Sequence, residues 1–440
     1  MNVKTFILFI ILLSSINSSS QDINANYKVR VIPIELLSKD ASLSKIGYGT
    51  SITSEYKINN YLRDTIVFTV NNAVRDFGPS NLKIIAKNLS SLKTERLDYK
   101  YDGYNLYVFL KADIGSCFYL SLQYTYIGTS FMSVPESNRR NIVIFGGDES
   151  FEHFTQMFFL PKKIILHNET LRLYNDTNLK AFSTLSEIKR NTKYIEYKFH
   201  EKDAINNLSV ILIDSNIYHS VVKFINKRKY FFYIRNQNLT IFENNIKKIT
   251  SKLKILDEYQ FSKSDFHIIE FDWRNKKNVK GRTYSDIMLI DISFLSKHYS
   301  SFIHEYLHSI LNIKYKNTSR NGFYLINESL IEYLAQYIYY HDSISKFNSY
   351  FKSKENGCEK DSVKLFNLKS NTAATFSSVY NCGPIYFYKM AKSIGFHQFF
   401  NIAITFFIQN KEKSFDTLIS SLKKKKVDDE IIDKFMNSVK

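Results

Sequence analysis

The sequence predicts an α+β protein in which an antiparallel β-rich domain precedes a mostly helical domain. Between about residues 27 and 199, apolar residues recur at every second position, as they do on strands that bury one face. Beyond residue 296, apolar residues recur at the spacing of a helix. The chain has 440 residues, which is long enough for two domains that each bury a core of their own.

The alternation in the first half is clearest at residues 65–70, 104–110 and 118–127. In the last of these segments, Leu120, Leu122 and Tyr124 fall on one face of the expected strand. Short strands separated by turns of Asn, Asp, Gly and Ser are typical of an antiparallel sheet. We therefore assign residues 21–225 to an N-terminal β-rich domain.

The second domain is assigned to residues 226–440. It opens with a predicted helix at residues 241–256, followed by strand-like segments at residues 266–271 and 287–292. The helical region after residue 296 is interrupted by polar segments at residues 314–322 and 371–377.

The amino terminus has the pattern of a targeting segment. Lys4 precedes an unbroken apolar run at residues 6–13, and small polar residues follow up to residue 20. The run is much shorter than the roughly 20 residues of a membrane-spanning helix, so residues 1–20 are predicted to be a cleaved signal peptide rather than a retained anchor. We expect an exported protein, which is secreted, periplasmic or on the cell surface, with no transmembrane segment.

The net charge of +18 does not predict a nucleic-acid partner. The lysines are scattered, and the one dense run, at residues 423–426, is followed at once by acidic residues 428–430. Such a run is typical of a solvated helix face. We therefore expect no nucleic acid among the partners.

Three cysteines occur, at Cys117, Cys358 and Cys382. An odd number leaves at least one thiol unpaired, and the spacing is not that of a structural zinc site. Cys358 and Cys382 can form a disulfide only if the fold brings them together, which the sequence leaves open.

The segment from His304 to His308 reads HEYLH, an HExxH motif. Residues four apart lie on one face of a helix, so the two imidazoles can bind one metal ion. Glu305 then faces the open coordination position, where a carboxylate can accept a proton from water. The motif predicts a site for one Zn²⁺ per chain, with Glu305 as the general base.

A catalytic zinc site needs a third protein ligand, and Glu328 is the candidate. It lies twenty residues after His308 in a second helical segment, NESLIEY, which a polar loop separates from the first. Two antiparallel helices would bring Glu328 over the histidine pair. Glu332, one turn later, is the competing candidate. We assign Glu332 to orienting an imidazole or to a surface charge.

HEYLH followed by NESLIEY resembles the gluzincins, in particular the aminopeptidase N-like family, in which the second segment typically reads N-E-G-[FLM]-A-x-[YF]. Nineteen residues separate His308 from Glu328, one more than is usual in that family. The polar loop at residues 314–322 can hold the extra residue. The resemblance implies a saddle-shaped β domain followed by a thermolysin-like catalytic domain that hydrolyses peptide bonds.

Two further segments are similar to motifs of that family. Residues 379–384 resemble its Y-x-x-G segment, which implies that Tyr380 donates a hydrogen bond to the oxyanion of the reaction. Residues 281–284 stand where the family has G-x-M-E, which implies that Gly281, Arg282, Thr283 and Tyr284 line the substrate site.

Tyr284 occupies the position of the glutamate that holds the substrate's amino terminus in the family. Arg282 would repel a cationic terminus, so a strict requirement for a free amine is not expected. Asp286 or an acid of the β domain are alternatives for that role. The sequence does not separate exopeptidase from endopeptidase, nor does it indicate substrate preference or oligomeric state.

The sequence therefore predicts a secreted zinc-dependent metallopeptidase that acts on peptides or proteins. The alternative is a non-catalytic peptide-binding protein on a gluzincin scaffold. The presence of Glu305 beside the predicted ligands favours the enzyme.

Overall fold

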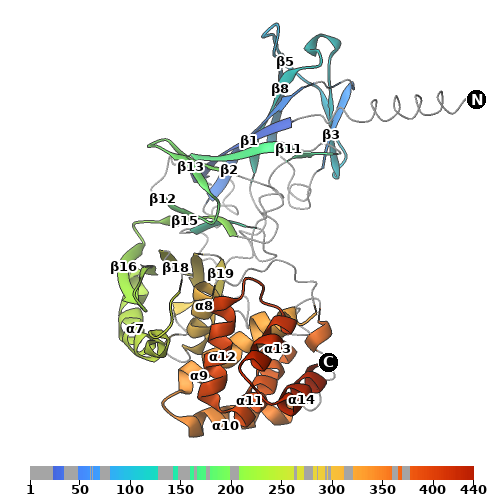
Figure 1. The fold of residues 1–440 in the computed structure, drawn as a ribbon. Coiled ribbons are helices and arrows are strands. Elements are labelled where there is room, and N and C mark those ends of the chain that lie inside the picture. The colour runs from blue at the N-terminus through green and yellow to red at the C-terminus, as the bar shows by residue number, and fades with distance from the viewer. Residues whose placement is uncertain are drawn as a thin grey trace, which may run out of the picture. The chain divides into compact units, whose positions relative to one another are not determined.

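The computed structural model describes residues 23–33, 48–59, 61, 63–69, 80–126, 142–146, 159–162, 166–174, 179–198, 208–261, 265–271, 281–284, 286–292, 295, 299–311, 321–358, 365–368 and 377–440. The predicted signal peptide lies outside these residues, as do residues 314–320 and 371–376 of the two predicted polar interruptions. Figure 1 shows the fold.

The chain divides into two compact units, Met1–Ile217 and Tyr218–Lys440. The division falls before β16 (Tyr218–Ile225), whereas we placed the domain boundary after residue 225. The reason is a hairpin. β16 pairs along its whole length with β17 (Arg228–Arg235), so the two strands belong to the same unit.

The first unit is built on an eight-stranded sheet with the order β13-β14-β11-β1-β2-β8-β4-β5 (Figure 1). Its strands are β1 (Ile23–Pro33), β2 (Tyr48–Ile58), β4 (Ser80–Asn88), β5 (Thr94–Arg96), β8 (Phe118–Tyr126), β11 (Leu166–Tyr174), β13 (Glu187–Arg190) and β14 (Tyr194–Lys198). The sheet is antiparallel as predicted except for one pair, because β1 and β11 run parallel. These two strands are joined by a long excursion, so no hairpin imposes their relative direction.

Two smaller sheets complete the first unit. One has the order β10-β3-β7-β6, and the other has the order β12-β15-β9. Their strands are β3 (Thr65–Thr69), β6 (Tyr99–Tyr101), β7 (Asn105–Phe109), β9 (Ile142–Gly146), β10 (Leu160–Pro161), β12 (Leu179–Ser183) and β15 (Leu208–Asp214). The predicted strands at residues 65–70, 104–110 and 118–127 are confirmed as β3, β7 and β8, and Leu120, Leu122 and Tyr124 are buried.

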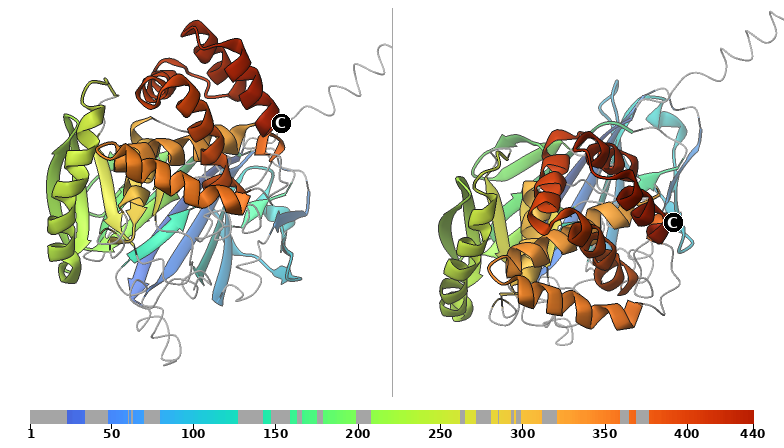
Figure 2. Two further views of the ribbon diagram at one scale, coloured as in Figure 1. Left: turned by 90° about the horizontal axis from the view of Figure 1, so that it is seen from below. Right: turned by 60° about the horizontal axis from the view of Figure 1, so that its bottom comes forward.

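The second unit contains a five-stranded sheet with the order β16-β17-β18-β20-β19. Its remaining strands are β18 (Phe266–Glu270), β19 (Gly281–Tyr284) and β20 (Ile287–Ile290). β17, β18 and β20 are parallel, because α7 (Leu239–Leu253) returns the chain between β17 and β18. Helix α7 lies beside β16 and β17 in Figure 2 and buries one apolar face. β19 is antiparallel to β20 and ends the sheet among the described strands.

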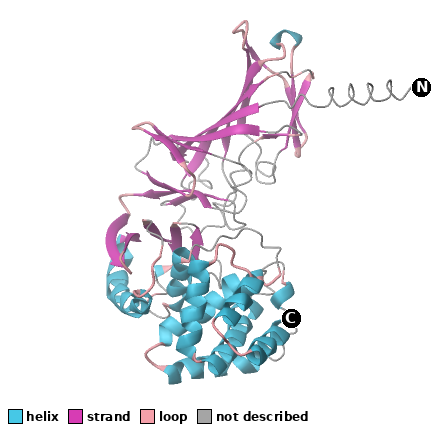
Figure 3. Ribbon diagram, viewed as in Figure 1, coloured by secondary structure: helices cyan, strands magenta, loops and turns pink. Residues whose placement is uncertain are grey.

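The other described elements of the second unit are helical, as the sequence predicts for the region after residue 296 (Figure 3). They are α8 (Ser300–Ile310), α9 (Leu330–Tyr340), α10 (Ile344–Cys358), α11 (Gly383–Ile394), α12 (Phe396–Gln409), α13 (Phe415–Lys424) and α14 (Asp429–Val439). Two π-helical turns, η7 (Leu325–Ser329) and η9 (Ser378–Cys382), directly precede α9 and α11. Within the described part of the chain, no helix is long and apolar enough to cross a membrane.

Candidate metal and catalytic site

The two histidines of the HExxH motif lie one turn apart on α8, and both are buried. Their Nε2 atoms are 2.9 Å apart. Phe302, Ile303 and Leu307 on the same helix are fully buried in the core of the second unit, which fixes the helix and the direction of its histidines.

Glu328 reaches the same point from η7. Its Oε2 atom lies 3.3 Å from His304 Nε2 and 3.5 Å from His308 Nε2. A tetrahedral zinc ion bound at about 2.0–2.2 Å separates its ligand atoms by roughly 3.3–3.6 Å. Two imidazole nitrogens and a carboxylate are also a ligand set that zinc prefers. Both distances from Glu328 fall in this range, whereas the 2.9 Å between the two Nε2 atoms is shorter, so a bound zinc ion would move the two imidazoles slightly apart. The donor set of the three side chains fits a zinc ion.

Glu332 contacts the other nitrogen of the first histidine. Its Oε2 lies 3.0 Å from His304 Nδ1, and Gln336 donates a hydrogen bond of 2.7 Å to its Oε1. A carboxylate on Nδ1 fixes the ring so that Nε2 points toward the site. This contact matches the orienting role assigned to Glu332.

The site stabilises positive charge. Burial by itself would lower the pKa of His304, but hydrogen bonds to Glu328 and Glu332 raise the pKa to about 10. Burial by itself would raise the pKa of Glu328. The charges and hydrogen bonds of His308 and His304 nevertheless hold that pKa well below its usual range. A carboxylate that stays ionised beside two imidazoles is suited to binding a cation.

The side chain of Glu305 extends from α8 to β19, the last strand of the sheet. Thr283 on β19 approaches it with its hydroxyl, 2.8 Å from Glu305 Oε2 and 2.9 Å from the Glu305 carbonyl oxygen. The hydroxyl has a single proton, so it donates to one of these oxygens at a time. Thr283 thereby orients the carboxylate proposed as the base.

Gly281 also faces Glu305. A Cβ atom at this position would lie 2.8 Å from Glu305 Cγ, so any larger residue would displace the glutamate. Gly281 and Thr283 share a face of β19 because successive side chains on a strand alternate. The sequence suggested these residues as substrate contacts but did not reveal their contact with Glu305. Their spacing of two was the available signal, although residues 281–284 were not predicted to form a strand.

The other two predicted substrate residues occupy the alternate positions of β19. Tyr284 is buried, with 7% of its surface exposed. Arg282 is paired with Leu289 of β20 in the strand register. Asp286, the alternative acid, is half-buried, and burial raises its pKa.

Tyr380 completes the cluster from η9. Its hydroxyl donates a hydrogen bond of 2.8 Å to Glu328 Oε2, and its ring centroid lies 5.8 Å from that of His304. The residue assigned to the oxyanion therefore lies beside the predicted metal ligands.

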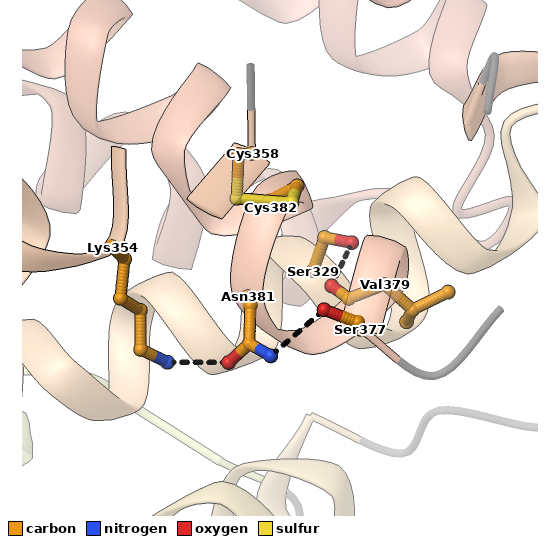
Figure 4. The surroundings of a disulfide bond; sticks show 7 residues. All are labelled: Ser329, Lys354, Cys358, Ser377, Val379, Asn381 and Cys382. Carbon is orange, nitrogen blue, oxygen red and sulfur yellow. Dashed lines mark hydrogen bonds between the residues drawn. A yellow bond between two sulfur atoms is a disulfide. The ribbon is translucent and has the colours of Figure 1, made fainter. Parts of the chain in front are cut away.

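Glu328 and Tyr380 both lie in π-helical turns, and the two turns contact each other. Ser329 donates a hydrogen bond of 2.7 Å to the carbonyl of Val379, as Figure 4 shows. Gly383 follows the second turn, and a Cβ atom there would overlap the Ser329 side chain. π-helical turns occur frequently at functional sites.

No family model and no curated protein matches this chain. Solved structures do. One is a two-domain M1 zinc metallopeptidase, a mutant bound to the amino acid L-tryptophan, with a TM-score of 0.50, 10% identity and coverage of 96% of this chain and 95% of the other. An M1 zinc metallopeptidase from Deinococcus radiodurans is similar with a TM-score of 0.49, 10% identity and coverage of 96% and 95%. Its mutant bound to the substrate Tyr-Ser-Ala has a TM-score of 0.48, 10% identity and coverage of 96% and 94%.

The likeness to the two-domain metallopeptidase concerns the fold. This chain shares its architecture, in which an N-terminal unit of β-sheets is followed by a mostly helical unit. The predicted α+β fold class is thereby confirmed.

Proposed function

We propose that this chain is a zinc-dependent metallopeptidase. The observation that carries the proposal is the convergence of the donor atoms of His304, His308 and Glu328, which lie within 4.8 Å of one another. Tyr380 donates a hydrogen bond to Glu328, and Glu305 directly follows His304 on α8. The fold shared with a zinc metallopeptidase supports it. His304 and His308 would hold the metal through Nε2, and Glu328 through its carboxylate.

A zinc ion held there would supply Lewis-acid chemistry, which lowers the pKa of a water molecule and polarises an amide carbonyl. Glu305 accepts the proton from that water and passes it to the departing amine. Thr283 keeps the Glu305 carboxylate in place through the hydrogen bond described above. Glu332 holds the His304 ring through Nδ1.

Tyr380 supplies the hydrogen-bond donor for the negative charge that develops on the carbonyl oxygen. Its hydroxyl already lies beside the metal ligands through its bond to Glu328. A small rotation of the phenol would transfer this donor to the substrate. A donor aimed at developing charge typically contributes a factor of about 10² to 10³ in rate.

The proposed substrate is a peptide or a protein. The enzyme itself is exported, and residues 1–20 are removed as a signal peptide. The apolar run after Lys4 supports export. The mature amino terminus can be read by sequencing the protein recovered from the medium or periplasm of an expressing host. Retention of residues 1–20 would contradict the proposed cleavage.

The direct test uses a peptide library with zinc-loaded protein, protein stripped with a chelator and stripped protein reloaded with zinc. We expect cleavage in the first and third samples and none in the second. If the zinc-loaded protein binds peptides without cleaving any, the alternative function, a peptide-binding protein on the same scaffold, replaces the peptidase.

A further inference from the structure

Two links join α10 to η9, the turn that carries Tyr380 (Figure 4). The Cys358–Cys382 disulfide connects the last residue of α10 to the last residue of η9, with Cα atoms 5.3 Å apart. One helical turn earlier, Lys354 Nζ donates a hydrogen bond of 2.9 Å to Asn381 Oδ1. Both links fall on the residues that directly follow Tyr380.

A third link holds the residue before Tyr380. The Val379 carbonyl accepts the hydrogen bond from Ser329, which directly follows Glu328 in η7. The Asn381 side chain also donates to Ser377 Oγ over 3.2 Å and so spans the turn itself. Tyr380 is therefore held between a link to η7 on one side and links to α10 on the other.

The Lys354 contact is unusual for a lysine. Burial lowers the pKa of Lys354, although the nearby charge of Glu332 acts in the opposite direction. Within the described residues it forms no ion pair, and its hydrogen bond goes to the neutral amide of Asn381. Lys354 Nζ also lies 4.6 Å from the centroid of the Tyr350 ring on the same helix, a cation–π contact. A part-buried ammonium group that donates to an amide is less well compensated than one in an ion pair, so we infer that the contact with Asn381 serves the position of η9.

We propose that the Cys358–Cys382 disulfide and the Lys354–Asn381 hydrogen bond are positioning elements that hold the Tyr380 hydroxyl where it can act on the substrate. This inference rests on the proposed peptidase function. A misplacement of a catalytic group by about 1 Å can lower the rate by roughly 10²-fold. The two links set the position of a single turn, so they affect turnover more than substrate binding.

The test compares the double variant Cys358→Ser/Cys382→Ser with the matched control Cys117→Ser, which removes the remaining cysteine from the other unit. With equal zinc content, the double variant is expected to lose about tenfold or more in kcat with little change in KM, since only positioning is lost. The control should keep the wild-type kcat. A double variant with wild-type kcat would overturn the proposal.

Combining the change with Tyr380→Phe separates positioning from a general structural role. Once the hydroxyl is absent, loss of the disulfide should lower kcat no further. If removal of the disulfide lowers kcat equally with and without the Tyr380 hydroxyl, the proposal is likewise overturned. Lys354→Met keeps the disulfide and removes the hydrogen bond to Asn381, together with the ammonium group over the Tyr350 ring. Its kcat should therefore fall in the same Tyr380-dependent way, even if the double variant folds poorly.

Hydrogen exchange gives a readout that does not depend on activity. In metal-free wild type, the amides of residues 377–382 are expected to exchange slowly. In the double variant they should exchange faster, while the amides of α12 stay unchanged. If oxidised, zinc-loaded wild type cleaves no peptide, the proposed function fails. Unchanged exchange at residues 377–382 would instead overturn the positioning role alone.

Discussion

The Tyr380 hydroxyl donates a hydrogen bond of 2.8 Å to Glu328 Oε2, although 52 residues separate the two in the chain. Each residue lies in a π-helical turn at the start of a helix. The two turns pack closely because Gly383 leaves room for Ser329, which in turn bonds to Val379. This packing places a hydrogen-bond donor and a metal ligand side by side.

Glu328→Ala should weaken zinc binding much more than Glu332→Ala does. Glu328 contributes a carboxylate oxygen next to both Nε2 atoms, whereas Glu332 lies against Nδ1 on the opposite side of the His304 ring. Loss of a residue that orients a ligand typically costs about 10–100-fold in metal affinity, and loss of the ligand should exceed that. Competitive titration with a zinc-binding dye measures both variants. The reverse order of affinities would make Glu332 the ligand.

Thr283→Val should lower kcat while zinc content stays at the wild-type level. Valine keeps the shape of threonine but cannot donate to Glu305 Oε2. Thr283→Ser keeps the hydroxyl and is the matched control, so it should retain most of the activity. Equal kcat values for the valine and serine variants would show that the hydrogen bond does not orient the base.

Gly383→Ala should destabilise the protein, because the new Cβ would overlap the buried side chain of Ser329. Overpacking of this kind typically costs about 1–3 kcal/mol in the free energy of unfolding. Denaturation in urea measures the change. A variant as stable as wild type would mean that η7 and η9 separate easily, which contradicts the close packing of the two turns.

Peptides with an acetylated amino terminus should be cleaved at rates similar to those of peptides with a free amino terminus. Tyr284 is buried and offers no carboxylate to an ammonium group, and burial raises the pKa of Asp286, which disfavours its charged form. A missing charge-assisted hydrogen bond removes about 1.5–3 kcal/mol, or roughly one to two decades of preference for the free amine.

Matched peptide pairs with free and acetylated termini measure that preference. If acetylation abolishes cleavage, the enzyme is an aminopeptidase whose amine site lies elsewhere. Asp286→Asn would then show whether this residue provides the site, since the preference for the free terminus should fall in that variant.

The sequence was sufficient to predict which residues of the helical region form the candidate site. His304 and His308 share a face because of a spacing that any helix imposes. Glu328 and Tyr380 were assigned from segments whose order resembles a known family, and the structure brings both to the histidines. The π-helical turns were not predicted, because no local sequence signal marks them. What accompanies them is a tertiary contact, the hydrogen bond from Ser329 to Val379.

The sheet was less predictable than the helices. Alternation located β3, β7 and β8 but carries no information on strand direction, so the parallel pairing of β1 with β11 was missed. The contact of Gly281 and Thr283 with Glu305 depends on how β19 lies against α8, which is a property of the packed unit. The Cys358–Cys382 pairing, which the sequence left open, depends likewise on the approach of α10 to η9.

The central claim is that Glu305 acts as the base beside a zinc ion held by His304, His308 and Glu328. The most direct measurement is the zinc content and peptide turnover of Glu305→Gln, both taken on one sample beside wild type. Glutamine keeps the shape of the glutamate but cannot accept a proton, so we expect one zinc per chain in both proteins and a fall in kcat of about 10²- to 10⁴-fold. Cleavage by zinc-loaded Glu305→Gln at the wild-type rate would contradict the account.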